Sequence, residues 1–189
     1  MRILVTGGAG YVGSVLSPAL LSRGHAVRVL DRLCFSEAPP TALQGCETVR
    51  GDIRRLQECP GLLDGVDAVI HLAGLSNDPS CDLIPEMAYD VNVESTRELA
   101  NQCMQAGVRR FVLASTCQVY GKAAFDVLDE GSPTAPVASF GRTKLEAEQA
   151  LPAACDRFEP VVARLGTVFG ASPRMRFDLA VNQMAATAV

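Results

Sequence analysis

The stretch SFGRTKLEAE, residues 139–148, holds two side chains at a spacing that acid–base chemistry uses. Lys144 follows Phe140 by four residues, so on a helix both side chains project from the same face. A lysine held beside a tyrosine would lower the pKa of the phenol and make a proton-transfer pair. Here the neighbour is a phenylalanine, which has no proton to exchange. Three hypotheses follow: an enzyme that lost its acid–base group, an enzyme that uses another group, or a binding protein.

A second candidate site is TGGAGYVGS, residues 6–14, which follows a predicted strand and opens a predicted helix. Gly7 permits a tight turn, Gly10 lets the backbone approach a pyrophosphate, and Gly13 lets the helix pack against the sheet. Asp31 ends the next predicted strand, where a carboxylate can bind both hydroxyls of a ribose. Together these residues predict a dinucleotide site.

The residues near that acid bear on which dinucleotide binds. Asp31 would repel a 2′-phosphate and so favours NAD over NADP, whereas Arg32 is a residue that can accommodate the phosphate. The tripeptide GDI, residues 51–53, ends the third predicted strand, where an adenine would lie. Asp52 is there either an acceptor for the adenine amino group or the N-cap of a helix.

Short β-rich runs alternate with longer helical runs along the chain. They predict strands at 3–6, 25–31, 47–52, 67–74, 109–116 and 160–167. Helices are predicted at 12–23, 85–106 and 140–154, with a last one beginning near Phe177, while residues 32–46 read as irregular. Strands that are apolar on both faces and separated by helices predict an α/β fold, a doubly wound parallel sheet in a three-layer αβα (Rossmann) arrangement.

Composition limits the function classes. The 189 residues suit one domain, and a net charge of -4 without a basic cluster argues against a nucleic-acid or anionic-membrane partner. No apolar run approaches the roughly 20 residues that span a bilayer, and the N-terminus does not resemble a signal peptide. Seven scattered cysteines and two histidines predict reduced thiols, a cytoplasmic protein and no metal site. The apolar end, residues 178–189, lacks a C-cap, so we expect a truncated frame or a boundary there.

Further motifs complete a familiar series: HLAG (71–74), VNVESTRELA (91–100), ASTCQVYG (114–121) and ARLGTVFG (163–170). With the motifs above, they occur in the order found in extended short-chain dehydrogenases/reductases. The chain most resembles the NAD-dependent nucleotide-sugar epimerases and dehydratases of that group, over essentially all its length. The resemblance implies a Rossmann domain over residues 1–189 that binds NAD, with most of the substrate domain absent from this chain.

The resemblance also implies roles for single residues. Thr116 falls at the catalytic Ser or Thr that bonds the sugar oxygen, Lys144 at the lysine that bonds the nicotinamide ribose, and Phe140 at the tyrosine. Leu72 and Ala73 would pass under the cofactor, Asn92 would tie neighbouring strands, and Leu165 would flank the nicotinamide. The full cofactor set is Gly7, Gly10, Tyr11, Val12, Gly13, Asp31, Arg32, Asp52, Ile53, Leu72, Ala73, Gly74, Asn92, Lys144 and Leu165. The substrate set is Asn77, Thr116 and Thr167, the last at a place where an asparagine often meets the substrate diphosphate.

Loss of the phenol at position 140 would cost about 10²–10⁴-fold in rate. Nearby candidates to replace it are Cys117 and Tyr120, although Tyr120 is expected to pack within its turn. Asp78 and Cys81 lie in SNDPSCD after the fourth predicted strand, either along the path of a substrate or in a polar loop with a helix N-cap. His71 is predicted to be a strand residue at the solvent edge of the sheet.

Two functions therefore stand side by side. One is an NAD-dependent enzyme that acts on a nucleotide-linked sugar by transient oxidation of a ring carbon. The other is a catalytically inactive NAD-binding protein that serves as a regulatory or scaffolding subunit. The resemblance further implies a homodimer through the helices at 85–106 and 140–154. Met87, Val91, Leu99 and Met104 would form the apolar side of that interface, or else belong to the core.

Overall fold

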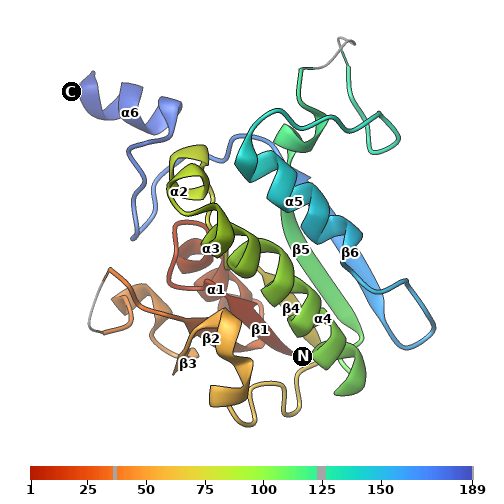
Figure 1. Ribbon diagram of the computed structural model, residues 1–189. Helices are drawn as coiled ribbons and strands as arrows, with labels where there is room; N and C mark the ends of the chain where they lie inside the picture. The colour runs from red at the N-terminus through yellow and green to blue at the C-terminus, as the bar shows by residue number, and fades with distance from the viewer. Residues whose placement is uncertain (36–37, 123–126, 189) are drawn as a thin grey trace.

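The computed structural model describes residues 1–35, 38–122 and 127–188. Its centre is a sheet of six strands that pair in parallel, in the order β3-β2-β1-β4-β5-β6 (Figure 1). The strands are β1 (Arg2–Thr6), β2 (Ala26–Asp31), β3 (Glu47–Arg50), β4 (Ala68–His71), β5 (Arg110–Thr116) and β6 (Glu159–Leu165). The strand order reverses between β1 and β4, which confirms the predicted Rossmann fold. In sheets of this type the ligand crevice lies at such a reversal, outside the carboxyl ends of the two strands.

Three strands end before the predicted residue, and one of them, β6, stops at Leu165 rather than residue 167. In the other two, β3 and β4, the last residues turn away from the sheet. β3 ends at Arg50 rather than residue 52, since the Asp52 side chain accepts a hydrogen bond from the Arg54 amide and caps the short 3-10 helix η2 (Ile53–Glu58). β4 ends at His71 rather than residue 74, and the Ala73 amide donates to the Thr6 side chain at 3.3 Å instead of to a strand. Both turns lie at the edge where the site is expected.

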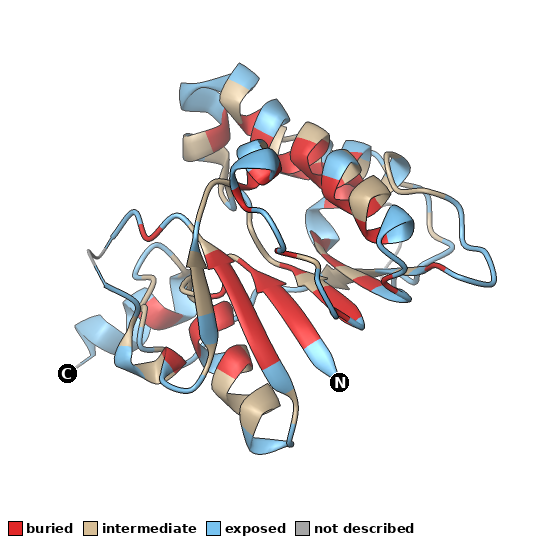
Figure 2. Cartoon of the chain, turned by 90° about the horizontal axis from the view of Figure 1, so that it is seen from below, coloured by how far each residue is buried: buried red, intermediate tan, exposed pale blue. Residues whose placement is uncertain are grey.

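Apolar side chains fill both faces of the sheet. On β1, Leu4 belongs to one core cluster, and Ile3 and Val5 belong to the other, as alternation along a strand requires. The first cluster is covered by α4 (Ser95–Gln105) and the second by α1 (Gly13–Ser22). Figure 2 shows the buried middle of the sheet between helices that are buried on their inner sides.

The predicted helix at 85–106 is in fact three segments. They are α3 (Pro85–Tyr89), a π-helical turn η3 (Asp90–Glu94) and α4, preceded by a short helix α2 (Asp78–Leu83). A π turn inserts one residue and leaves the flanking helices nearly continuous, so the periodicity of the sequence does not reveal it. Gly107, with a φ of 78°, follows the end of α4 as predicted.

The other helical predictions differ mainly at their ends. α5 (Ser139–Gln149) stops before the predicted residue 154, because Pro152 disfavours helix in the residue before it. The last helix, α6, spans Ala180–Thr187 and so begins after Phe177. The irregular stretch after β2 contains one 3-10 turn, η1 (Thr41–Leu43), and another, η4 (Cys117–Tyr120), follows β5.

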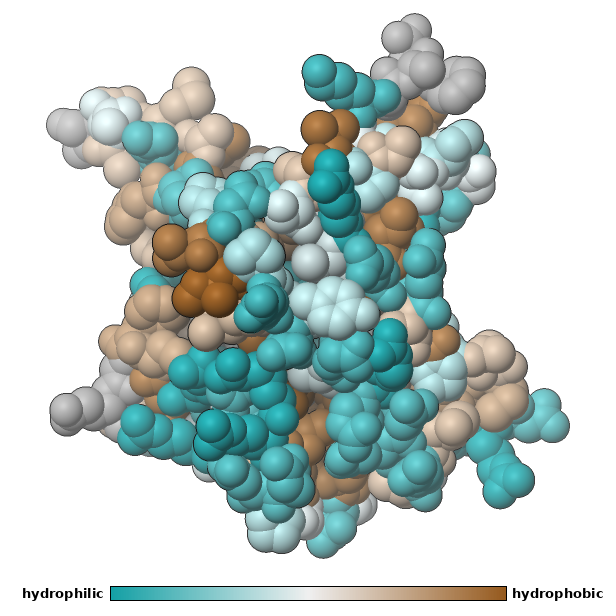
Figure 3. All heavy atoms as spheres, viewed as in Figure 1, coloured by the Kyte–Doolittle hydropathy of each residue, from teal (hydrophilic) through white to brown (hydrophobic). Residues whose placement is uncertain are grey.

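The four residues expected either in an interface or in the core fall into different environments. Leu99 is fully buried, Val91 is 8% exposed, and Met87 packs against the same core. Met104 is 40% exposed on α4. Figure 3 shows mostly hydrophilic side chains over the front of the molecule and an apolar cluster beside α2, which ends at the exposed Leu83. Core packing therefore accounts for Leu99 and Val91.

Within the described residues, no helix is long and apolar enough to cross a membrane. The same residues bring together no group of three His, Cys, Asp or Glu side chains that would hold a metal ion. All seven cysteines are free thiols.

The burial of Leu99 predicts a large and local effect on stability. Leu99→Ala should lower the free energy of unfolding by about 2–5 kcal/mol, because it leaves a cavity under α4. Met104→Ala, on the exposed side of the same helix, should change it by less than about 0.5 kcal/mol. Urea denaturation followed by circular dichroism measures both. Equal losses in the two variants would contradict this division of the helix.

Candidate cofactor and active site

The glycine-rich loop between β1 and α1 is held by close backbone contacts. A Cβ atom on Gly7, which has a φ of 69°, would lie 2.7 Å from the Ala73 nitrogen. A Cβ on Gly13 would lie 2.5 Å from the Gly8 Cα. Glycine is therefore required at both positions, as the sequence predicts. No side chain caps the N-terminus of α1, although the Ser14 and Val15 amides donate to the carbonyls of Gly10 and Val12. Among the described residues no backbone bond is found for the amides of Tyr11, Val12 and Gly13, and these are the donors available to an anion.

Asp31, at the end of β2, is hydrogen-bonded to this loop. One carboxylate oxygen accepts from the Ala9 amide at 3.0 Å and the other from the Leu33 amide at 2.8 Å. Each oxygen keeps a further lone pair, so the carboxylate can still accept from a ribose hydroxyl. The side chain thus lies where the sequence predicts an acid beside the glycine-rich loop.

Asp52 and Arg32 form an ion-pair cluster next to it. Asp52 pairs with Arg54 at 2.6 Å and with Arg32 at 3.4 Å. The hydrogen bond from Arg54 is the main reason why the pKa of the Asp52 carboxyl is lowered to about 2. The sequence left open whether Asp52 accepts from an adenine or caps a helix, and in the structure it is the N-cap of η2. Arg32 is drawn toward Asp52, and its side chain remains half exposed.

The loop after β4 is fixed by Asn92. The side chain of Asn92 accepts from the Leu75 amide at 2.9 Å and donates to the Leu75 carbonyl at 3.0 Å. It also donates to Thr143 Oγ1 on α5 at 3.0 Å. Asn92 therefore ties a loop to a helix, and the expectation that it ties two strands is wrong. Gly74 packs beneath it, because a Cβ there would lie 2.9 Å from Asn92 Oδ1.

The helix α5 carries Phe140 and Lys144 to the end of β5. A Cβ on Gly141 would lie 2.9 Å from the Gln118 carbonyl oxygen, so α5 packs tightly on the turn that follows Thr116. The Phe140 amide donates to Asp78 Oδ1 at 3.0 Å, which docks α2 on the start of α5. The Thr116 side chain is nearly buried and accepts from the Gln118 amide at 3.2 Å. The sequence-predicted trio thus shares one corner of the site.

Lys144 has an unusual environment for an ammonium group. It is 5% exposed, and among the described residues no hydrogen bond to it is found. Burial lowers its pKa from 10.5 to about 8, although Glu148 and Cys81 oppose this shift. The buried side-chain polar atoms without a hydrogen bond in the described chain are Ser17 Oγ and Arg28 Nε, so the Lys144 nitrogen keeps a trace of exposure. A ligand oxygen that reaches it would accept from a largely desolvated ammonium.

The groups considered as replacements for the tyrosine are differently placed. Tyr120 is buried, its hydroxyl lies 3.1 Å from the donating Arg164 Nη1, and the guanidinium carbon of Arg164 lies 5.0 Å from the centre of its ring. This is the expected packing role. Cys117 is exposed. Cys81 is fully buried, and burial is the main cause that raises the pKa of its thiol, so it does not line an open substrate path.

Asn77 caps α2, where its side chain accepts from the Ser80 amide at 2.8 Å. The alternative of a polar loop with an N-cap is therefore realised. Leu165 ends β6 and Thr167 follows it in an exposed stretch. The assignment of Asn77 and Thr167 to a substrate stays a prediction.

Three features of the site were not anticipated. Tyr11 Oη donates to the Gly170 carbonyl at 2.7 Å and accepts from Asn182 at 3.0 Å, so the glycine-rich loop holds the C-terminal segment. Behind Thr116, Ser115 donates to Glu148, which pairs with Arg164 at 2.7 Å. These contacts join residues far apart in sequence, and no local pattern signals them.

The third feature corrects the expectation for His71. This histidine is fully buried rather than at a solvent edge. Its Nδ1 lies 2.6 Å from Thr6 Oγ1, and its Nε2 lies 2.9 Å from Thr96 Oγ1. Burial is the main cause that lowers the pKa of the imidazole to about 3.

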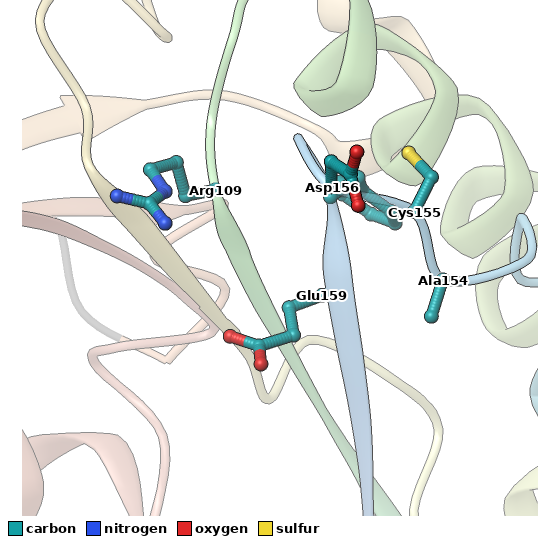
Figure 4. A pocket seen from close by; sticks show the side chains of 6 residues that line it. Arg109, Ala154, Cys155, Asp156 and Glu159 are labelled. Atoms are coloured by element: carbon teal, nitrogen blue, oxygen red, sulfur yellow. The ribbon is translucent and has the colours of Figure 1, made fainter.

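A surface hollow lies at the opposite edge of the sheet. It is lined by Arg109, Ala154, Cys155, Asp156, Phe158 and Glu159, around the starts of β5 and β6 (Figure 4). None of the predicted site residues contributes to it. The candidate site is therefore the crevice at the carboxyl ends of the strands.

Comparisons with known proteins agree with this geometry. The model of the NAD dependent epimerase/dehydratase family matches residues 3–189, and the chain belongs to that family. The chain is 36% identical over 185 residues to a UDP-glucose 4-epimerase of Azospirillum brasilense. This alignment covers 93% of the present chain but only 51% of the relative.

Two solved structures are similar with a TM-score of 0.84 each. One is TunA, an NAD dependent NDP-hexosamine 5,6-dehydratase, which is 32% identical and matched over 98% of this chain and 60% of its own. The other is MoeE5 in complex with UDP-glucuronic acid and NAD, which is 31% identical and matched over 97% of this chain and 60% of its own. The chain spans about half to three fifths of the length of these three proteins.

The buried histidine predicts how stability responds to acid. His71 stays neutral in the native state down to about pH 3, whereas in the unfolded chain it binds a proton below about 6.5. The unfolded state therefore gains protons as the pH falls, and stability decreases with it. Between pH 6.5 and 4.5 we expect a loss of about 2 kcal/mol, since each pKa unit is worth about 1.4 kcal/mol.

Urea denaturation at a series of pH values measures this loss. The window avoids Asp52, whose stabilising contribution is lost only as the pH falls from its ordinary 3.8 toward about 2. In His71→Gln the dependence between pH 6.5 and 4.5 should become flatter. A wild-type stability that stays constant over this window would show that His71 takes up a proton in the native state.

Proposed function

We propose that this member of the NAD dependent epimerase/dehydratase family binds NAD in the crevice at the carboxyl ends of its strands. We further propose that it acts on a nucleotide-linked sugar by transient oxidation of a ring carbon. The observation that carries the proposal is the glycine-rich loop, closed on Ala73 by Gly7 and clasped by the Asp31 carboxylate. NAD would supply the acceptor for a hydride.

The residues present fit such a dinucleotide. The amides at Tyr11, Val12 and Gly13, at the start of α1, suit the pyrophosphate, and Asp31 retains acceptor capacity for the adenosine ribose. Lys144 offers a largely buried ammonium whose pKa is lowered by burial to about 8, which suits the hydroxyls of the second ribose. Tyr11, Val12, Ile53, Leu72 and Leu165 belong to the same proposed cofactor site.

The sugar would be oriented by Thr116. Its oxygen already accepts from the Gln118 amide, and within the described part of the chain its own hydrogen has no acceptor. It would therefore donate to the sugar oxygen that is oxidised. Asn77 and Thr167 would contact the rest of the nucleotide sugar. Relatives in complex with UDP-glucuronic acid or UDP-glucose and NAD support this class of substrate.

A second candidate function rests on Phe140. In this chain the ring has no hydroxyl, Cys81 is a buried thiol of raised pKa, and the hydroxyl of Tyr120 is held by Arg164. These observations favour an NAD-binding protein without turnover, with a regulatory or scaffolding role. The homodimer and the cytoplasmic location expected from the sequence remain predictions for the whole protein.

The first prediction of the proposal concerns the choice of cofactor. NAD should bind at least about tenfold more tightly than NADP, because Asp31 would repel the 2′-phosphate. Asp31→Ser should narrow this preference for NAD, whereas Asp156→Asn, at the opposite edge of the sheet, should leave it unchanged. Titrations followed by thermal shift or intrinsic fluorescence measure the affinities. Equal affinities in the wild type would assign control of the site to Arg32.

The second prediction concerns the buried ammonium. Lys144→Met should raise the free energy of unfolding of the ligand-free chain by about 1–3 kcal/mol, since it removes a buried charge without changing the volume much. The same variant should bind NAD at least about tenfold more weakly. Lys122→Met, at the other lysine of the chain, should change neither quantity. Unaltered NAD affinity in Lys144→Met would remove Lys144 from the site.

The third prediction separates the two functions. Phe140→Tyr, in the longest form of the protein that the gene encodes, should raise the rate of NAD reduction with sugar nucleotides by about 10²-fold or more. The wild type should bind NAD and turn over slowly or not at all. Absorbance of the reduced nicotinamide follows the reaction. If the wild type turns over rapidly and tyrosine adds nothing, another group takes the proton, and Cys117 is the next residue to replace.

A further inference from the structure

His71 is the centre of a buried series of hydrogen bonds that crosses the domain. It ends β4, next to the loop at Ala73, and both of its ring nitrogens contact threonine hydroxyls. Thr6 comes from β1 and Thr96 from α4. All three side chains are fully buried. The imidazole thus joins the middle of the sheet to the helical layer in front of it.

The protons of this series have one consistent arrangement. Thr96 Oγ1 donates its single hydrogen to the Asn92 carbonyl at 2.7 Å, so it can only accept from His71 Nε2. His71 therefore carries a hydrogen on Nε2. Because the ring is neutral in its buried environment, Nδ1 is an acceptor, and Thr6 Oγ1 donates to it at 2.6 Å. Thr6 in turn accepts from the Ala73 amide.

A second, shorter series of hydrogen bonds begins at the side chain of Asn92. The Asn92 side chain donates to Thr143 Oγ1 at 3.0 Å, and Thr143 donates to the Phe140 carbonyl at 3.0 Å. The backbone carbonyl of Asn92 thus ends the first series and its side-chain amide begins the second, so Asn92 connects the two. One end is the loop that closes on Gly7, and the other is the helix that carries Lys144. In the opposite tautomer of His71, Nε2 and Thr96 Oγ1 would face each other with no hydrogen between them.

We propose that His71, as the neutral Nε2–H tautomer, is a positioning residue that sets the loop at Ala73 relative to α5. The inference rests on the proposed NAD site, because these two segments would hold opposite parts of the cofactor. A histidine that only fills the core would affect the stability of the fold. A positioning histidine also affects the affinity of the folded protein for NAD.

Electrostatics in this part of the core keep the tautomer neutral. Lys144 lies close enough to lower the pKa of His71 further, so protonation would place a second buried cation beside the first. The partners of the ring on both sides are hydroxyls of Thr6 and Thr96, and neither nitrogen contacts a carboxylate. Among the described residues, a charged imidazole would have no counter-ion at hydrogen-bond distance.

The first test observes the tautomer directly. Histidine labelled with ¹⁵N gives two sets of imidazole signals, and His25→Asn assigns the set that belongs to His71. We expect a protonated Nε2 and a bare Nδ1 for His71, unchanged from pH 8 to pH 5. A hydrogen on Nδ1, or a signal averaged between the two tautomers, would overturn the proposal without reference to NAD.

The second test interrupts the series at Thr96. Thr96→Val removes the hydroxyl with little change in volume, and Thr96→Ser restores it. Ser17→Ala is the matched control, since Ser17 is a fully buried hydroxyl without a hydrogen bond among the described residues. We expect NAD to bind about tenfold more weakly to Thr96→Val, and within about twofold of wild type to Thr96→Ser and Ser17→Ala.

Hydrogen exchange at Ala73 and Leu75 accompanies the binding assay, because both amides donate to members of the series. In Thr96→Val these two amides should exchange about tenfold faster relative to the core strands. If the wild type does not bind NAD, the proposed function fails. The positioning role is then tested by the exchange rates of the Ala73 and Leu75 amides alone. Unchanged exchange in Thr96→Val, or wild-type NAD affinity in a chain that binds NAD, overturns it.

Discussion

The close approach of two loops at the carboxyl ends of β1 and β4 is the constraint on which the candidate site depends. Gly7 lies so near the Ala73 backbone that a methyl group would overlap it, and the Ala73 amide donates to Thr6 at the end of β1. In a parallel sheet whose order reverses at this point, the two loops border one crevice. Removal of the contact would separate the anion-binding end of α1 from the loop that passes below it.

Around this contact, stability and proposed function compete at particular residues. Lys144 is largely buried, and burial lowers the pKa of its ammonium to about 8, so its charged form lowers the stability of the ligand-free fold. The glycines of the loop add flexibility to the unfolded chain and cannot be replaced without overlap. A fold without a ligand would have little use for either feature. Phe140 is the exception, because an apolar ring at that place favours packing over proton transfer.

Much of this could be predicted because it depends on local pattern. Apolar runs separated by helical runs determine a parallel sheet, and the turn chemistry of Gly7 and Gly13 identifies the loop. The sequence pattern places the ends of β3 and β4 too late, because backbone amides there donate to side chains instead of to a neighbouring strand. The Arg54 amide donates to Asp52, and the Ala73 amide donates to Thr6. His71 is buried against Thr6, and Tyr11 is hydrogen-bonded to Gly170 in the C-terminal segment. In both pairs the partner lies more than 60 residues away in the sequence. Such contacts leave no periodic signal.

A crystal structure of the chain with NAD tests the central claim most directly. The account predicts the pyrophosphate over the amides at the start of α1, the adenosine ribose on the Asp31 carboxylate and the nicotinamide ribose within hydrogen-bond distance of the Lys144 ammonium. Phe140 should face the nicotinamide with no protein oxygen at the place of the missing phenol. A cofactor bound elsewhere, or bound in the crevice without contact to Asp31 and Lys144, would contradict the account.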